Sequence, residues 1–410
     1  MAKTDWKAEA RTLKKRLRKL EAPAADAPKG KPVSPLAPAR FPALPVIAGV
    51  RFAAVEAGVR YPDRKDVMLV RLAPGTAMAG VFTRSSTRSA CVRDCQAKLA
   101  MQVPPGAVAA ALGVPVARVF SSSTGVIGEP LPHARITARI DDLVAGLRED
   151  AIEMAAHAMM TTDTFPKGAA AEVQGEGGVI RIAGIAKGSG MIAPDMATML
   201  VYIFTDARIA PAALHKLLAR HVDATFNSIT VDGDTSTSDT LLIAATGQSA
   251  AAEVKGPVLK AFAAALHGVM RDLALQVVRD GEGATKLVEV RVSGAATKAD
   301  AAKVAFAIAN SPLVKTAVAG EDPNWGRIVA AVGRSGAAAE RDRLTIRFGD
   351  ILVAGSGWRN PKYREAEGAA YMRGQELLLH VDLGMGRAKR TVWTCDLTAR
   401  YVEINADYRS

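Results

Sequence analysis

The chain has 410 residues, of which 49% are hydrophobic, 23% charged and only 5% aromatic, a composition typical of a globular protein. Its net charge is +12, but residues 1–32 hold ten Lys or Arg against four Asp or Glu, so this segment alone carries half of the excess. The rest of the chain is mildly basic and poor in rings that stack on bases, which argues against nucleic-acid binding.

The first segment with a recognisable pattern, residues 5–21, is basic and has its apolar residues near one side of a helix. Residues 22–46 are rich in Pro and Ala and predict a linker. We therefore expect residues 1–46 to form a disordered extension. A tail that binds a partner or RNA is the alternative.

From residue 47 onward, the apolar pattern predicts strands and helices that alternate without a regular β–α–β period. The expected helices are 107–112, 141–160, 211–221, 257–279 and 298–308. The expected strands are 67–72, 80–82, 116–123, 180–185, 199–204, 288–292, 344–347, 376–383, 389–397 and 401–404. This pattern favours mixed α/β layers over a doubly wound sheet.

Three cysteines, Cys91, Cys95 and Cys395, are too few and too widely spaced for a disulfide framework, and no second ligand pair completes a zinc site. The sequence therefore predicts buried, reduced cysteines.

No run approaches the roughly 18 apolar residues of a membrane span, and the first twenty residues lack the apolar core of a secretory signal. These features, together with the reduced cysteines, predict a cytoplasmic protein.

The densest stretch of small and polar residues, 185–198, runs through Ala197 and Thr198 into an apolar strand. If the bond before Thr198 were cut, the new α-amine, with a reference pKa near 7.7–8.0, would suit a general base acting on its own hydroxyl. Spacing alone does not show the cut, because a threonine at a strand start also fits β propensity.

Seven blocks, in order, resemble the ornithine acetyltransferase family, also called glutamate N-acetyltransferase or ArgJ. The most specific is Lys187-Gly-Ser-Gly-Met-Ile-Ala-Pro-Asp-Met-Ala-Thr-Met-Leu200. The other six are residues 122–128, 160–167, 231–240, 280–286, 322–327 and 401–410. The resemblance covers the chain from about residue 47 to residue 410, so it implies a function for nearly all of it.

The resemblance implies an enzyme that cleaves itself between Ala197 and Thr198, giving an α chain (1–197) and a β chain (198–410). Thr198 would then take the acetyl group of N2-acetyl-L-ornithine and pass it to L-glutamate by a ping-pong mechanism, in arginine biosynthesis. Many family members also accept acetyl-CoA, and we expect the same here. No other cofactor is expected.

Further site residues are carried over from the matched blocks. Thr124 and Gly125 match the oxyanion hole, whose donors face the developing charge. Lys187 suits a substrate carboxylate, and Glu282 matches an active-site acid that meets the ornithine amine or assists proton transfer. The substrate contacts implied are Thr162, Lys187, Thr198, Glu282, Asn405 and Ser410.

Three carboxylates, Asp232, Asp234 and Asp239, invite a metal-site interpretation, but the Glu that closes an EF-hand loop is missing and the family needs no metal. The sequence departs from the family pattern at Asp195 and Ser238, where Asn is common, and in the short segment 100–106. None of these departures removes a site residue named above.

The fold implied is the layered α/β/β/α sandwich shared with the self-cleaving β-aminopeptidases. A main catalytic domain is expected at 47–284 and a smaller C-terminal α/β domain at 285–410, with its tail returning to the site. The cleaved chains are expected to assemble as an α2β2 heterotetramer. The rival interpretations are a self-processing aminopeptidase on the same scaffold and a basic nucleic-acid-binding protein.

Overall fold

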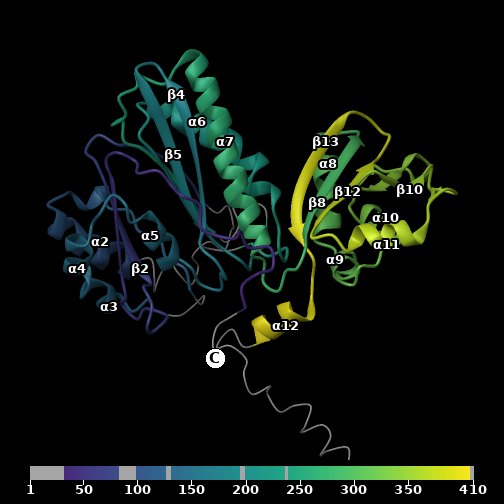
Figure 1. Ribbon diagram of the computed structural model, residues 1–410, viewed down its shortest axis with the longest axis horizontal. Helices are drawn as coiled ribbons and strands as arrows, with labels where there is room; N and C mark the ends of the chain where they lie inside the picture. The colour runs from purple at the N-terminus through teal and green to yellow at the C-terminus, as the bar shows by residue number, and fades with distance from the viewer. Residues whose placement is uncertain (1–31, 83–97, 126–130, 194–198, 236–238, 407–410) are drawn as a thin grey trace, which may run out of the picture. The chain divides into compact units, whose positions relative to one another are not determined.

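The computed structural model describes residues 32–82, 98–125, 131–193, 199–235 and 239–406, and for 98–102 it describes the backbone alone. The chain divides into two units, Met1–Val33 and Ser34–Ser410. The second unit contains a five-stranded, a six-stranded and a two-stranded sheet (Figure 1).

The five-stranded sheet is the centre of the catalytic part predicted from the sequence. Its order is β3 (Ala77–Phe82), β7 (Thr240–Ala245), β6 (Leu200–Thr205), β5 (Gly178–Lys187) and β4 (Lys167–Gly175). Neighbours are antiparallel except β6 and β7, which run parallel. Every residue of β6 is buried, which explains its continuous apolar sequence.

Helices cover one face of this sheet. In Figure 1, α7 (Gly256–Arg279) lies along β4 and β5. Helix α6 (Pro211–Ala224) packs on β3. Leu266 and Leu273 of α7 are fully buried in the same cluster as Ile182 of β5. Among the described helices, α7 alone is long and apolar enough to cross a membrane, but half of its apolar window is buried as a core helix would be.

The opposite face packs against a second sheet, formed by β1 (Val50–Val55) and β2 (Val67–Leu72). The rings of Phe52 in β1 and Phe204 in β6 meet edge to face, with centroids 5.1 Å apart. Helices α4 (Ile140–Ala145) and α5 (Ile152–Ala158) pack against β1 and β2. This arrangement confirms the predicted layered sandwich of helices and sheets.

The C-terminal part has its own core on a six-stranded sheet. The order is β11 (Trp358–Arg359), β10 (Ile351–Gly355), β9 (Thr345–Phe348), β12 (Glu376–Asp382), β8 (Leu287–Ala295) and β13 (Ala388–Cys395). Helices α8 (Lys298–Ala309), α9 (Pro312–Ala319), α10 (Trp325–Gly333) and α11 (Glu365–Met372) belong to this part. The two parts join where Thr230 donates its backbone N–H to the Trp393 carbonyl at 2.9 Å.

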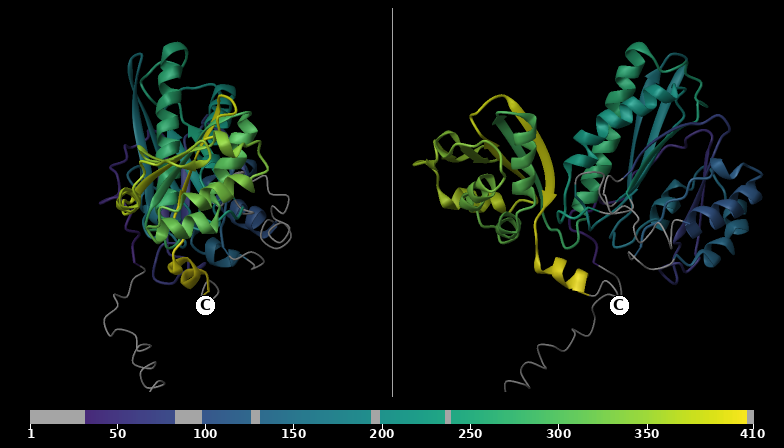
Figure 2. Two further views of the ribbon diagram at one scale, coloured as in Figure 1. Left: turned by 90° about the vertical axis from the view of Figure 1, so that its right-hand side faces the viewer. Right: turned by 180° about the vertical axis from the view of Figure 1, so that it is seen from behind.

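Three predicted elements are wrong. The strand at 116–123 is a short 3-10 turn (Val116–Arg118) followed by irregular chain, and the exposure of Phe120 shows that no partner sheet covers it. The helix at 141–160 is broken into α4 and α5, because Arg148 forms a β-bridge with Phe52. The strand at 401–404 is helix α12 (Ala399–Ala406), which follows β13 in Figure 2.

The structure also differs from the expected start of one helix and from the expected linker at residues 22–46. Helix α2 (Lys98–Leu112) begins nine residues before the predicted 107, continuing through Pro104 and Pro105, and α3 (His133–Thr137) was not predicted. Residues 34–46 contact the main unit instead of forming a free linker, since the Ser34 hydroxyl donates to the Arg279 carbonyl at 2.6 Å. The predicted helix at 5–21 lies outside the described residues, and the predicted domain boundaries stay predictions.

Candidate active site

The C-terminal end of β5 and the start of β6 lie side by side at the predicted site. Lys187, the last residue of β5, pairs with Leu200, the first residue of β6. Ala197, Thr198 and Ser410 lie outside the described residues. The residue after Thr198 is described: the Met199 N–H donates to Asp239 Oδ1 at 2.8 Å, and its carbonyl accepts the Thr240 N–H at 3.0 Å.

The loop that leaves β5 connects two of the predicted substrate residues. The hydroxyls of Ser189 and Thr162 are hydrogen-bonded at 2.6 Å, and the Ser189 carbonyl accepts the Glu282 N–H at 2.9 Å. A Cβ at Gly190 would lie 2.5 Å from the carboxyl carbon of Glu282, so only glycine lets that carboxyl approach the loop. Thr162 and Glu282 therefore meet the same short segment after Lys187.

Helix α12 brings a third predicted residue to this place. Asn405 Nδ2 donates to Glu282 Oε2 at 2.8 Å, although 123 residues separate them in the chain. The start of α12 is held by Thr398, whose hydroxyl donates to the Gly283 carbonyl at 2.8 Å. Gly283 has a φ of +74°, and a Cβ there would lie 2.7 Å from the Tyr401 nitrogen. Helix α12 therefore lies beside Glu282 and Gly283, while the return of the tail to an active site stays a prediction.

A carboxylate supports both the loop and the helix. Asp232 accepts the backbone N–H groups of Met191 at 2.6 Å and Ile192 at 3.0 Å. It also accepts the Tyr401 hydroxyl at 3.4 Å. Burial raises the pKa of Tyr401, and the nearby negative charges of Asp232 and Glu282 raise it further, so this phenol remains a donor. Asp232 therefore acts as a structural acceptor between the two segments.

Lys187, the predicted contact with an amine in its side chain, has 4% of its surface exposed. Burial lowers the pKa of Lys187 and the positive charge of Lys167 lowers it further, while the charges of Asp163 and Glu282 oppose the shift. The site therefore places a buried amine and a buried acid, Glu282, around the same loop. Such a pair suits an amino-acid substrate, which carries both a carboxylate and an ammonium group.

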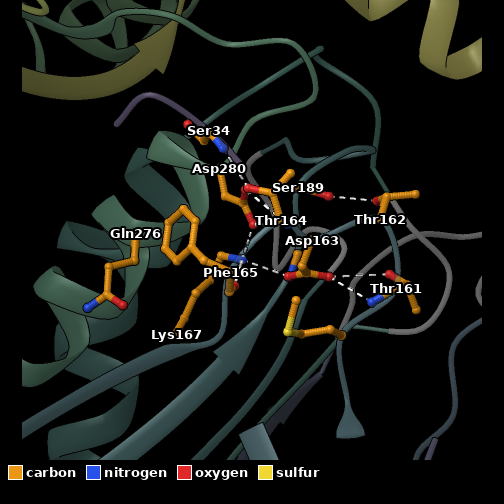
Figure 3. A network of polar contacts seen from close by, with 12 residues as sticks. Ser34, Thr161, Thr162, Asp163, Thr164, Phe165, Lys167, Ser189, Gln276 and Asp280 are labelled. Carbon is orange, nitrogen blue, oxygen red and sulfur yellow. Dashed lines mark hydrogen bonds and ion pairs between the residues drawn. The ribbon is translucent and has the colours of Figure 1, made fainter. Parts of the chain in front are cut away.

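A buried ion network lies behind this site (Figure 3). Lys167 Nζ contacts Asp163 Oδ1 at 2.7 Å and Asp280 Oδ2 at 2.5 Å, and all three side chains are fully inaccessible. Asp163 Oδ1 also accepts the Gly188 N–H at 2.7 Å, and Asp280 binds the Thr164 N–H at 3.0 Å. Because Asp280 lies two residues before Glu282, the network ties both sides of the site to one cation.

The neighbouring charges within this network determine the protonation state of Asp163 and Lys167. Burial acts to raise the pKa of Asp163, but the charges of Lys167 and Lys187 and the Gly188 N–H outweigh it, so the pKa is lowered. Burial acts to lower the pKa of Lys167, but Asp163 and Asp280 raise it. Asp163 and Lys167 therefore form a charged pair inside the protein.

The predicted oxyanion-hole residues lie on a separate segment. The Ser122 hydroxyl is hydrogen-bonded to the Tyr202 hydroxyl of β6, which holds this segment near the strand that follows residue 198. Thr124 is half-buried and Gly125 exposed. Within the described ranges, neither forms a hydrogen bond with Lys187 or Glu282, so their role stays a prediction.

Some supporting residues were not assigned from the sequence. Asp163 and Lys167 lie in the block at 160–167, and Asp280 begins the block at 280–286, so their presence in these blocks was the available signal. Asp239 was considered only as a metal ligand. Its contact with Met199 could not be read from spacing, since 40 residues separate the two.

The aspartates of the cluster considered as metal ligands bind backbone N–H groups of different segments. Asp232 accepts N–H groups of the loop after β5, whereas Asp239 accepts that of Met199. In the part of the chain that the structure describes, no three His, Cys, Asp or Glu side chains group as metal ligands.

Comparison with known proteins identifies relatives along nearly the whole chain. The model of the ArgJ family matches residues 105–410. The arginine biosynthesis bifunctional protein ArgJ of Ruegeria pomeroyi is 62% identical over 405 residues, covering 92% of this chain and 98% of that protein. The protein of the same name from Rhizobium meliloti is 51% identical over 409 residues, covering 92% and 99%. A crystal structure of argJ from Bacillus halodurans is 41% identical, with a TM-score of 0.49, and covers 52% of this chain and all of that one.

Proposed function

The chain belongs to the ArgJ family, and from that premise we propose that it transfers acetyl from N2-acetylornithine to glutamate in arginine biosynthesis. The acetyl group is carried on Thr198 after self-cleavage between Ala197 and Thr198. The observation that carries this proposal is the contact of Asn405 with Glu282 beside the loop that follows Lys187. Three residues matched to the family, from distant parts of the chain, thus gather at the strand end that precedes residue 198.

The chemistry assigned to Thr198 follows from its new N-terminus. An α-amine with a pKa near 7.7–8.0 is partly neutral at physiological pH and accepts the proton of the adjacent hydroxyl as that oxygen attacks the acetyl carbonyl. Thr124 and the Gly125 N–H are assigned to the oxygen that becomes negative in the tetrahedral intermediate. Release of ornithine leaves an acetyl ester, which glutamate then attacks.

Glu282 and Lys187 are proposed to bind different charged groups of the amino-acid substrates. Glu282 meets the ammonium group of ornithine, and Lys187 meets a carboxylate. Thr162, Asn405 and Ser410 complete the substrate contacts. Because donor and acceptor are both amino acids, one set of charged groups serves each half of the ping-pong cycle.

The proposal is tested by mixing the purified protein with N2-acetylornithine and glutamate in the absence of coenzyme A. We expect N-acetylglutamate and ornithine in equal amounts, and an acetyl adduct on the fragment that begins at Thr198 when acetylornithine is supplied alone. Release of free acetate without transfer to glutamate would instead favour the self-processing hydrolase.

A second activity is proposed with acetyl-CoA as the acetyl donor, in keeping with the word bifunctional in the names of the relatives. Acetyl-CoA and glutamate alone should then yield N-acetylglutamate and coenzyme A. No further cofactor is proposed. Failure of this reaction, with transfer from acetylornithine intact, would restrict the enzyme to the recycling reaction.

The cleaved chains are proposed to stay together and to assemble as an α2β2 heterotetramer in the cytoplasm. Strand β5 precedes the cut and β6 follows it, and the two pair from Ile182–Thr205 to Lys187–Leu200. Cleavage therefore leaves a ladder of hydrogen bonds between the α and β chains. Native mass measurement of the cleaved protein tests the stoichiometry.

Replacing Glu282 with glutamine is expected to lower kcat/KM for acetylornithine by about 100-fold, because a lost charged hydrogen bond costs about 3 kcal/mol. Steady-state kinetics measures the effect. The matched control is Glu403→Gln, which removes an exposed carboxylate on α12 that pairs with Arg400. The control should leave kcat/KM unchanged, and an unchanged value for Glu282→Gln would remove this residue from substrate recognition.

A further inference from the structure

The buried carboxyl group of Asp239 has no place in the acetyl transfer described above. Only 2% of the residue is exposed, and it directly precedes β7. Its Oδ1 accepts the Met199 N–H at 2.8 Å. That nitrogen belongs to the peptide bond between residues 198 and 199, so the carboxyl group lies beside the residue at which the chain is proposed to cut itself.

The second oxygen of this carboxyl group lacks a partner. Among the described residues, Asp239 Oδ2 has no hydrogen-bond partner, although the atom is buried. A buried polar atom without a partner is costly and is commonly retained for a functional reason. An oxygen that must give or receive a proton during a reaction is one such reason.

The environment keeps this carboxyl group protonated. Burial raises the pKa of Asp239 to about 9, while the Met199 N–H and the charge of Lys187 oppose the rise. Lys187, at the end of β5 and separated from β7 by β6, is the charged group of the described residues that acts on it, and Met199, directly before β6, contributes its backbone N–H. At neutral pH the group is therefore an acid that still holds its proton.

We propose that Asp239 donates the proton that the nitrogen of residue 198 requires when the Ala197–Thr198 bond breaks. This inference rests on the self-cleavage proposed above. By covalent structure alone, the nitrogens of residues 198 and 199 are three bonds apart, hence separated by less than about 4 Å in any conformation. Since Asp239 Oδ1 lies 2.8 Å from the nitrogen of residue 199, the nitrogen of residue 198 is at most about 7 Å from that oxygen, a gap that one or two water molecules bridge.

The step balances without another reactant. The Thr198 hydroxyl oxygen bonds to the Ala197 carbonyl carbon, and the bond from that carbon to the Thr198 nitrogen breaks. Asp239 gives its proton to the leaving nitrogen and is reprotonated by the proton lost from the hydroxyl, directly or through water. The product is an ester, which one water molecule hydrolyses to the Ala197 carboxylate and the free Thr198 hydroxyl.

The test follows cleavage of the full chain after labelled cell-free synthesis, by gel and intact mass. Asp239→Asn keeps an acceptor for the Met199 N–H but cannot supply the proton. We expect it to slow cleavage by about 100-fold or more, the usual size of a general-acid effect. The matched control is Asp206→Asn, at the opposite end of β6, where a buried carboxyl accepts the Arg181 N–H at 2.8 Å. The control should cleave like the wild type.

Hydroxylamine distinguishes the two stages, because it cleaves an ester but not an amide. If Asp239 serves the first step, no ester accumulates in Asp239→Asn and hydroxylamine does not restore cleavage. Restoration of the wild-type rate by hydroxylamine would overturn the proposal, because the defect would then lie in ester hydrolysis.

The pH profile of the wild type gives a readout that does not depend on a variant folding. The acid is protonated below its pKa, so cleavage should decline as the pH rises through about 9. A rate that stays constant or increases across that range would contradict the proposal. If uncut wild-type protein transfers acetyl, the proposed self-cleavage is wrong. If the wild type and Asp239→Asn are cleaved at equal rates, only the role proposed for Asp239 is wrong.

Discussion

Replacing Thr198 with alanine is expected to leave the protein as one uncut chain of 43.0 kDa and to abolish acetyl transfer. Both results have one cause, because the hydroxyl that attacks the Ala197 carbonyl later carries the acetyl group. Wild-type protein should instead appear on a denaturing gel as two fragments of similar size, residues 1–197 and 198–410.

The conservative substitution Thr198→Ser is the comparison for Thr198→Ala. Thr198→Ser keeps the hydroxyl and should restore both cleavage and transfer in part, whereas alanine should restore neither. Intact mass and a transfer assay on the same samples measure the two properties together. Full activity in wild-type protein whose residue 198 is still joined to residue 197 would refute the mechanism.

Replacing Lys167 with methionine is expected to cause the largest loss of stability. The change leaves Asp163 and Asp280 buried without their shared cation, and breaking a buried ion pair on one side costs about 3–5 kcal/mol. Denaturant unfolding should show this loss as a lower midpoint. Since Asp163 binds the Gly188 N–H and Asp280 precedes Glu282, the folded fraction should also have a higher KM.

The matched control breaks an ion pair at the surface. Arg51→Met removes the contact with Glu149 at 3.4 Å, in which both side chains are about half exposed. Exposed pairs contribute at most about 1 kcal/mol, so this variant should unfold almost like the wild type. Equal effects of the two substitutions would mean that Lys167 does not stabilise the network in the way inferred from its contacts.

The two strands beside the candidate site were predicted well, because they depend on local sequence. Residues 180–185 and 199–204 read as strands because they are apolar and rich in β-branched residues, and both strands are present as β5 and β6. The small polar residues between them predict a connection at the ends of these strands. Lys187 and Thr162 could therefore be named before any contact was known, with the family resemblance giving them their roles.

The C-terminal helix shows where local pattern failed. Residues 401–404 contain Tyr, Val and Ile, which favour a strand, yet they lie in α12. The helical spacing puts Tyr401 and Asn405 one turn apart, so that they reach Asp232 and Glu282. These long-range contacts outweigh a weak β propensity, and no window of sequence contains them.

By itself, the sequence determined the family, the run of apolar strands around the proposed cut, and most of the residues assigned to the substrates, because these features are written in short ordered blocks. The tertiary structure alone decided that Asp239 meets Met199, that Lys167 joins Asp163 to Asp280, and that Asn405 meets Glu282. Each of these contacts except the Asp163–Lys167 pair joins residues at least 40 positions apart. The contacts of Asp239 and Lys167 gain strength from burial away from water, which only the packed chain provides.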